Sequence, residues 1–265
     1  MIEPLDAATI SAALPSAVWH VDVVVETEST NTDLRNAASE GTAEPGQVLV
    51  AEHQRAGRGR LGRRWESAPG AGLTFSALVA PTAAPLDRWG WLPLLAGLAV
   101  AEAVEATAGV PLKVKWPNDV LSGGGLKIAG VLCERVDTAT APLAIVGIGL
   151  NVTAGPDQLP VPTAGSLAML GATTTDRPAL LAAILDRLAA RLAGWLAQGG
   201  DAAAAGLLDA YAARSATLGR QVIVAAPGGE QISGEATHID LTGALVLRTV
   251  DGTSTVAAGD VTGVE

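Results

Sequence analysis

The chain has 265 residues, of which 49% are hydrophobic, and a formal net charge of −10. This composition excludes an intrinsically disordered protein and suffices for one sizeable core with a smaller second domain. The negative charge argues against broad attraction to nucleic acid or to an anionic membrane, and the single cysteine, Cys133, excludes an internal disulfide and is expected to be buried. Because the first residues lack a basic segment followed by an apolar one, we expect a soluble, cytoplasmic protein.

Strands and helices alternate along most of the chain. Periodicity and turn residues predict strands over residues 21–28, 47–54, 73–80, 113–116, 127–136 and 141–152. They predict helices over residues 29–41, 88–108, 176–197 and 201–216. Asp176 and Pro178 are typical of a cap and a first turn. The most apolar stretch, residues 91–110, is interrupted by proline and glutamate, so we expect a core helix rather than a membrane span.

The alternation of strands and helices gives way to short β-strand patterns after about residue 218. Glycine-rich turns separate short runs of β-forming residues at 221–227, 232–240 and 244–250. We therefore expect two domains, residues 1–217 and residues 218–265, of which the second is a small β domain. Together they predict the α+β class, with a mixed β-sheet in the larger domain.

Arginines crowd the segment AEHQRAGRGRLGRRWES, residues 51–67, at Arg55, Arg58, Arg60, Arg63 and Arg64. Its core, GRGRLG, matches the dinucleotide fingerprint G-x-G-x-x-G, but the residues that follow are typical of a loop and not of the helix that this fingerprint requires. An arginine hook for the minor groove of DNA and a solvated loop without a role are alternatives. Because like charges repel unless an anion is bound, we interpret the segment as a mobile anion-binding loop that orders with its ligand.

The lysines of the chain, Lys113, Lys115 and Lys127, all lie in the segment KVKWPNDVLSGGGLK. Two lie beside a Trp-Pro-Asn-Asp turn, where Asn118 and Asp119 are suited to bind a ligand or a metal, and the third opens a predicted strand after a glycine-rich turn. No G-x-x-x-x-G-K-[ST] loop is present. Nucleotide phosphates would therefore need another kind of site.

Five motifs occur in order along the chain: TESTN, AEHQRAGRGRLGRRW, KVKWPNDVL, LKIAGVLCE and VGIGLNV. Together they closely resemble the biotin protein ligase family. The resemblance implies a catalytic domain of the class II aminoacyl-tRNA synthetase and biotin ligase type, followed by a small SH3-like β-barrel. The sequence departs from the family in two places. Too few residues precede the first predicted strand to form the DNA-binding winged helix that some members carry, and Leu61 stands where many relatives have a basic residue.

The family activates biotin with ATP to biotinyl-5′-adenylate, releases pyrophosphate and passes biotin to a lysine of an acceptor domain. The resemblance therefore implies biotin, ATP and Mg²⁺, a biotin carboxyl carrier domain of biotin-dependent carboxylases as partner, and no binding of DNA or of membranes. Since the carboxylate of biotin is the nucleophile, no catalytic Cys/His or Ser/His pair is needed. The chemistry needs positive charge instead, because the carboxylate and the α-phosphate are both anions.

The resemblance implies that Arg58 and Lys127 are catalytic residues which contact the carboxylate of biotin and the α-phosphate. The biotin-binding residues that it implies are Ser29, Thr30, Asn31, Gln54, Gly57, Arg58, Arg60, Lys127, Gly130 and Gly147. Those for the nucleotide are Arg60, Arg63, Trp65, Lys115, Asn118 and Asn151. Two assignments stay open, because Trp65 either stacks on adenine or packs in the core, and Asp119 either supports Mg²⁺ or caps its turn.

Two other functions compete with a biotin ligase that lacks repressor activity. A lipoate or octanoate ligase or transferase shares the fold, but its recognised patterns lack the GRGRxGR loop and the KWPND turn. A DNA-binding protein is disfavoured by the net charge of −10. Comparing adenylate formation with biotin and with lipoate distinguishes a biotin ligase from a lipoate enzyme. Mobility-shift assays with DNA at low salt would reveal a DNA-binding protein.

Overall fold

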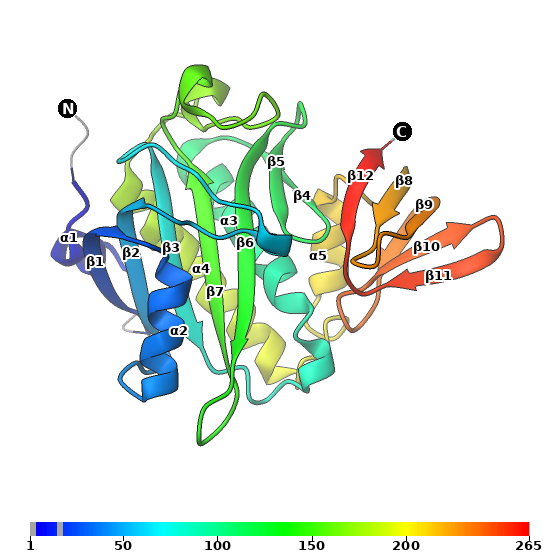
Figure 1. The fold of residues 1–265 in the computed structure, drawn as a ribbon, viewed down its shortest axis with the longest axis horizontal. Helices are drawn as coiled ribbons and strands as arrows, with labels where there is room; N and C mark the ends of the chain where they lie inside the picture. Colours follow the sequence, from blue (N-terminus) through cyan, green and yellow to red (C-terminus); the bar gives the residue numbers. More distant parts are fainter. Residues whose placement is uncertain (1–3, 15–17, 265) are drawn as a thin grey trace.

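The computed structural model describes residues 4–14 and 18–264. Its larger part is a seven-stranded sheet with helices on both faces (Figure 1). The strands of this sheet are β1 (His20–Thr27), β2 (Gln47–Gln54), β3 (Gly72–Val79), β4 (Leu112–Lys115), β5 (Asp119–Ser122), β6 (Lys127–Val136) and β7 (Leu143–Asn151). The α-helices are α1 (Ala7–Ala13), α2 (Thr30–Glu40), α3 (Trp91–Ala108), α4 (Arg177–Ala197) and α5 (Leu207–Arg214).

The sheet is mixed, which confirms the expected α+β class. Its strands lie in the order β1-β2-β3-β7-β6-β5-β4. β1 and β2 are parallel, whereas all other neighbours in this order are antiparallel. All residues of β3 are buried, because this strand lies well inside the sheet and helices cover both faces.

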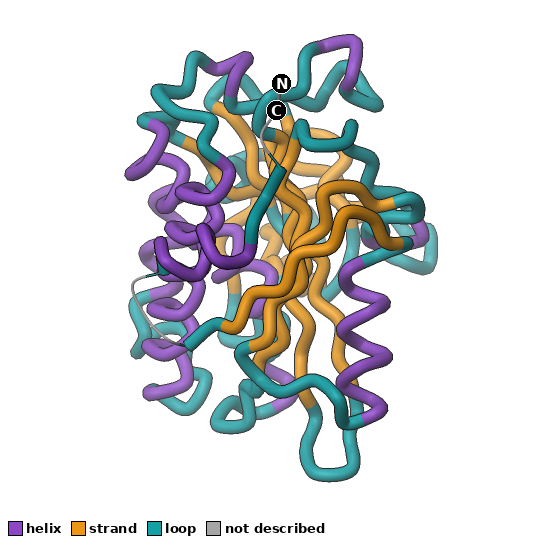
Figure 2. The backbone as a smooth tube through the Cα atoms, turned by 90° about the vertical axis from the view of Figure 1, so that its left-hand side faces the viewer, coloured by secondary structure: helices purple, strands orange, loops and turns teal. Residues whose placement is uncertain are grey.

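Helices on the two faces have different partners. α2 packs over β2, β3 and β7 on one face, whereas α3 and α4 pack together on the other, as Figure 2 shows with the sheet between the two helical layers. α2 begins where the Ser29 hydroxyl accepts a hydrogen bond from Thr32 N and ends at Gly41, with φ of 72°. α3 is long and apolar enough to cross a membrane, but 72% of it is buried inside the protein, as in a core helix.

The remaining strands form a second, antiparallel sheet beside the edge strand β4 (Figure 1). They are β8 (Gln221–Ala225), β9 (Gln231–Ile239), β10 (Leu245–Thr249), β11 (Gly252–Val256) and β12 (Asp260–Val264), in the order β11-β10-β9-β8-β12. Two indoles of the larger part hold the turn between β9 and β10. Trp91 Nε1 donates to Asp240 O at 3.0 Å, and Trp116 Nε1 donates to Gly243 O at 3.1 Å.

Several elements differ from the sequence-based predictions. The helix predicted over 201–216 begins only at Leu207, because Gly206 has φ of 69°, which no α-helix allows. β5 was not predicted, since only its first residue, Asp119, had been assigned, to the Trp-Pro-Asn-Asp turn; the glycine-rich turn that follows β5 folds it back against β6. α1, β11 and β12 were not predicted. Cys133 was expected to be buried, but it is only partly buried. The protein groups packed around its thiol still raise the pKa of the thiol, because they shield it from water.

Candidate functional site

A cavity with about 670 Å³ of atom-free space, part of it open to solvent, lies between the N-terminus of α2, the central strands and the arginine-rich segment. Its lining brings together residues that are far apart in the sequence: Ser29, Thr30, Asn31, Gln54, Arg58, Gly59, Arg60, Arg63, Arg64, Trp65, Thr74, Phe75, Asn118, Asp119, Lys127, Gly130, Val131, Leu132, Gly147, Ile148 and Gly149. The cavity therefore combines converging polar and charged groups with a smaller apolar surface from residues such as Phe75 and Ile148, and such a lining suits a polar, charged small molecule.

Hydroxyl and amide groups line one side of the cavity. Gln54 Oε1 accepts hydrogen bonds from Thr30 N at 2.8 Å and from Thr30 Oγ1 at 3.0 Å. Thr30 Oγ1 also lies 2.7 Å from Ser76 Oγ, and Ser76 Oγ donates to Asn31 Oδ1 at 2.6 Å. Because each group fixes its neighbour, this chain presents donors and acceptors in a set arrangement, as recognition of a polar ring system requires.

Glycines in β6 and β7 make room for two of the side chains in the cavity. Gly130 and Gly149 are opposite one another on these strands, and the Trp65 indole lies against both. A Cβ at Gly149 would lie only 2.2 Å from Trp65 Cε2, and a Cβ at Gly147 would lie 2.0 Å from Asn31 Oδ1. Side chains at these positions would therefore displace the indole and the amide from the cavity.

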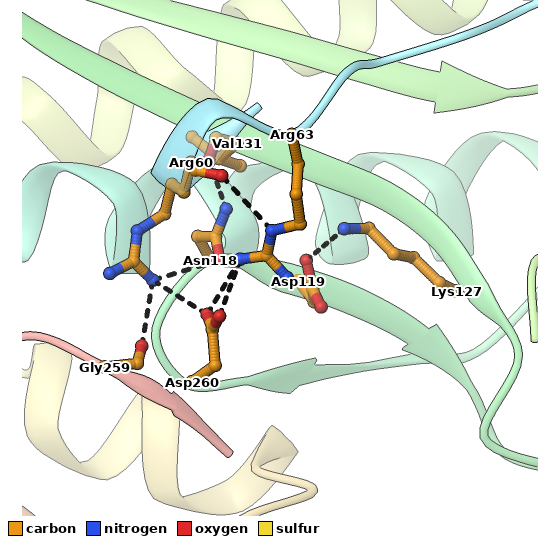
Figure 3. Close-up of polar contacts among 8 residues, drawn as sticks. All are labelled: Arg60, Arg63, Asn118, Asp119, Lys127, Val131, Gly259 and Asp260. Carbon is orange, nitrogen blue, oxygen red and sulfur yellow. Dashed lines mark hydrogen bonds and ion pairs between the residues drawn. The ribbon is translucent and has the colours of Figure 1, made fainter. Parts of the chain in front are cut away.

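Positive charge gathers on the other side, and four of these cations, Arg58, Arg60, Arg63 and Lys127, have carboxylate partners within the protein. Lys127 Nζ lies 2.5 Å from Asp119 Oδ1, and Arg58 Nη1 lies 3.6 Å from Glu134 Oε1. Figure 3 shows Arg60 and Arg63 turned toward Asp260 of β12, together with the Lys127 pair. The sequence-based prediction of self-repelling arginines did not include these partners, which offset the repulsion without a bound anion.

The arginine-rich segment folds back on itself above the cavity. Gly59 N donates to Arg63 O at 2.7 Å, and a short 3₁₀ turn, Arg60–Gly62, forms its tip. Leu61 has φ of 54° there and is 61% exposed. Burial lowers the pKa of the Arg60 guanidinium, and Asp260 opposes this shift. Arg60 nevertheless stays charged, since an arginine pKa lies far above neutral pH.

The structure brings the predicted site residues into this cavity with three exceptions. Gly57 is not in the lining, and its lack of a side chain lets Gln54 and the Trp65 backbone approach closely. Asn151 is buried and donates from Nδ2 to Gly165 O at 2.9 Å, so its side chain holds a neighbouring loop. Lys115 lies at the end of β4, outside the lining.

Sequence reasoning missed residues that contact the expected ones. Glu134 accepts a hydrogen bond from Asn31 Nδ2 at 2.8 Å and pairs with Arg58. Asp260 of the second sheet and the Gly259 carbonyl beside it contact Arg63 and Arg60, which line the cavity. Glu134 stands in the quoted motif LKIAGVLCE, so its position was a usable signal, whereas the sequence contained no sign that the contacts from residues 259 and 260 exist.

The part of the chain that the structure describes contains no preformed metal site. Among residues 4–14 and 18–264, no group of three or more His, Cys, Asp or Glu side chains is placed to hold a metal ion. Asp119 is the carboxylate in the cavity lining, and its Oδ1 is buried without a hydrogen-bond donor of good geometry, although Lys127 lies beside it. One carboxylate fits Mg²⁺, which commonly binds one or two carboxylates and the phosphates of the substrate.

Comparisons with known proteins agree with this geometry. The model of the biotin/lipoate A/B protein ligase family matches residues 23–151, and that of the biotin protein ligase C-terminal domain matches residues 217–262. A biotin–[acetyl-CoA-carboxylase] ligase from Mycobacterium tuberculosis is 42% identical, with 97% of this chain and 95% of the relative covered. The bifunctional ligase/repressor BirA of Escherichia coli is 31% identical, with 86% and 68% covered.

A solved structure shares the fold as well. The biotin protein ligase from Aquifex aeolicus in complex with biotin and ATP has a TM-score of 0.74 and 30% identity, with 91% of this chain and 97% of that chain covered. The sequence relatives span nearly the whole chain, and the cavity lies within the part that the first family model matches. This chain therefore belongs to the biotin protein ligase family.

Proposed function

We propose that this chain is a biotin protein ligase that activates biotin with ATP and then transfers it to a lysine of a biotin carboxyl carrier domain. The observation that carries the proposal is the cavity, which has hydroxyl and amide groups on one side and guanidinium and ammonium groups on the other. Biotin has a ring system with hydrogen-bonding groups at one end and a carboxylate at the other, so its two ends match these two sides. The family membership supports the same substrates.

In the first step, an oxygen of the biotin carboxylate attacks the α-phosphorus of ATP, the bond to the bridging oxygen breaks, and pyrophosphate leaves. Both reactants are anions, so the protein must supply positive charge where they meet. Lys127 and Arg58 do this at the carboxylate and the α-phosphate, and Arg60 and Arg63 bind the other phosphates.

The remaining assigned residues hold the substrates in place. Gln54, Thr30 and Asn31 bind the ring system of biotin, and Trp65 offers its indole face to adenine from the platform of Gly130 and Gly149. Asp119 is the residue suited to hold Mg²⁺, which when bound with ATP would neutralise phosphate charge. Lys115 and Asn151 lie outside the cavity lining, which weakens their assignment to the nucleotide.

In the second step, the amine of the acceptor lysine attacks the carbonyl carbon of biotinyl-5′-adenylate, and AMP leaves.

We divide the chain between residues 217 and 218 into a catalytic domain and a C-terminal domain, a division supported by the separate five-stranded sheet. A cytoplasmic location fits the supply of ATP, and the net charge of −10 favours a protein acceptor over DNA.

ATP–pyrophosphate exchange, measured with and without biotin, tests the first step. Exchange that depends on biotin is expected, and the same assay with lipoate distinguishes the related ligases that the family model includes. Transfer is tested with a biotin carboxyl carrier domain and with its lysine-to-arginine variant as control. Exchange that is equal with and without biotin, or that requires lipoate, would overturn the proposal.

A further inference from the structure

We propose that Asp260 is a positioning residue for the nucleotide: its carboxylate holds the two arginines of the phosphate site in the free enzyme, and ATP must displace it. The proposal rests on the proposed function, because that function makes Arg60 and Arg63 ligands of the phosphates. It assigns a role to the C-terminal domain, from which Asp260 contacts two arginines of the cavity lining.

Contacts between Asp260 and the arginines are specific (Figure 3). Arg63 Nη2 donates to both carboxylate oxygens of Asp260, at 2.9 and 2.8 Å. Arg60 Nη1 lies 3.7 Å from Asp260 Oδ1 and donates to Gly259 O at 3.2 Å and to Asn118 Oδ1 at 3.5 Å. A carbonyl and a carboxylate on adjacent residues thus bind two guanidinium groups of one loop.

The position of Asp260 is set by the fold. It begins β12 opposite Ala225 of β8, and a Cβ at Gly259 would lie 2.7 Å from Ala225 O, so the turn before β12 packs closely on β8. The Trp91 and Trp116 indoles attach the same sheet to the catalytic domain. Asp260 is therefore presented to the loop by a strand that is paired within a sheet attached to the catalytic domain.

A carboxylate and a phosphate are recognised by the same planar guanidinium groups, so both cannot use the same donors at once. The Arg63 side chain is 58% exposed and that of Asp260 is 26% exposed, so the pair is accessible to an incoming anion and only weakly stabilised. ATP carries several negative charges and wins this exchange. The exchange lowers the apparent affinity for ATP, because only enzyme molecules whose arginines have left Asp260 bind the phosphates fully.

Asp260→Asn is expected to lower the KM for ATP in biotin-dependent pyrophosphate exchange by about fivefold, the upper range for a partly exposed ion pair, and to leave kcat within about twofold. Asp260→Glu keeps the charge and is expected to restore the wild-type KM. Asp251→Asn makes the same change in an exposed turn of the same domain and serves as the matched control. Circular dichroism and melting curves confirm that each variant is folded.

A second measurement follows the loop without catalysis. Trypsin is expected to cleave between Arg58 and Arg64 several times faster in free Asp260→Asn than in the free wild type, and equally slowly in both with saturating biotinyl-5′-adenylate. A KM for ATP that is unchanged or raised in Asp260→Asn, or equal cleavage of the two free proteins, would overturn the proposal. Wild-type enzyme without biotin-dependent exchange would instead refute the proposed function, while the comparison of the free proteins would still test the contact.

Discussion

Lys127→Ala is expected to slow the formation of biotinyl-5′-adenylate by about a hundredfold. The Lys127 ammonium lies 2.5 Å from Asp119 Oδ1 and 5.9 Å from the centroid of the Trp65 ring, so it is held inside the cavity where the carboxylate and the α-phosphate would meet. Charge builds on the phosphate oxygens as the bond forms, and the ammonium stabilises it more than it stabilises the bound substrates. Losing one such preorganised contact typically costs about 3 kcal/mol, which corresponds to the hundredfold change.

Single-turnover measurements of biotinyl-5′-adenylate, with enzyme in excess over ATP, isolate this step from transfer and product release. The Lys127 side chain is 37% exposed, so the variant is expected to lose less than about 1 kcal/mol of folding stability. Lys127→Met keeps the apolar stem and controls for packing. Adenylate formation at the wild-type rate by Lys127→Ala would refute the reasoning.

Two further substitutions test the cavity and the core. Gly149→Ala is expected to displace Trp65, because the new Cβ would lie 2.2 Å from the indole. The affinity for biotinyl-5′-adenylate, measured by calorimetry, is expected to fall at least about tenfold. An unchanged affinity would show that Gly149 does not position the Trp65 indole for the ligand. Arg177→Ala is expected to cost about 3 kcal/mol of stability in urea unfolding, because it leaves the Glu52 carboxylate, only 14% exposed, without its ion-pair partner. Arg187→Ala, on an exposed position of the same helix, is the control, and equal stability of the two variants would contradict the prediction.

Features that depend on neighbouring residues could be predicted from the sequence. α2 and α4 begin at Ser29 and Asp176, whose side chains accept hydrogen bonds from backbone amides three residues later. The strands β2, β3, β6 and β7 lie close to their predicted ranges. A strand buried on one face has alternating apolar residues and a strand buried on both faces has a continuous apolar run, so the pattern can be recognised in the sequence. The family motifs likewise indicated Gln54, Arg58 and Lys127, which the fold brings into one cavity.

Only the tertiary structure decided how the charges of the site are paired. Arg60 and Gly259 are 199 positions apart, and no local pattern indicates that β12 would lie above the arginine-rich segment. The sequence by itself determined where positive charge is concentrated and which helices and strands carry the cavity. The carboxylate partners Glu134 and Asp260 depend on the order of the strands and on the docking of the second sheet, which result from packing of distant apolar surfaces and not from the residues beside each charge.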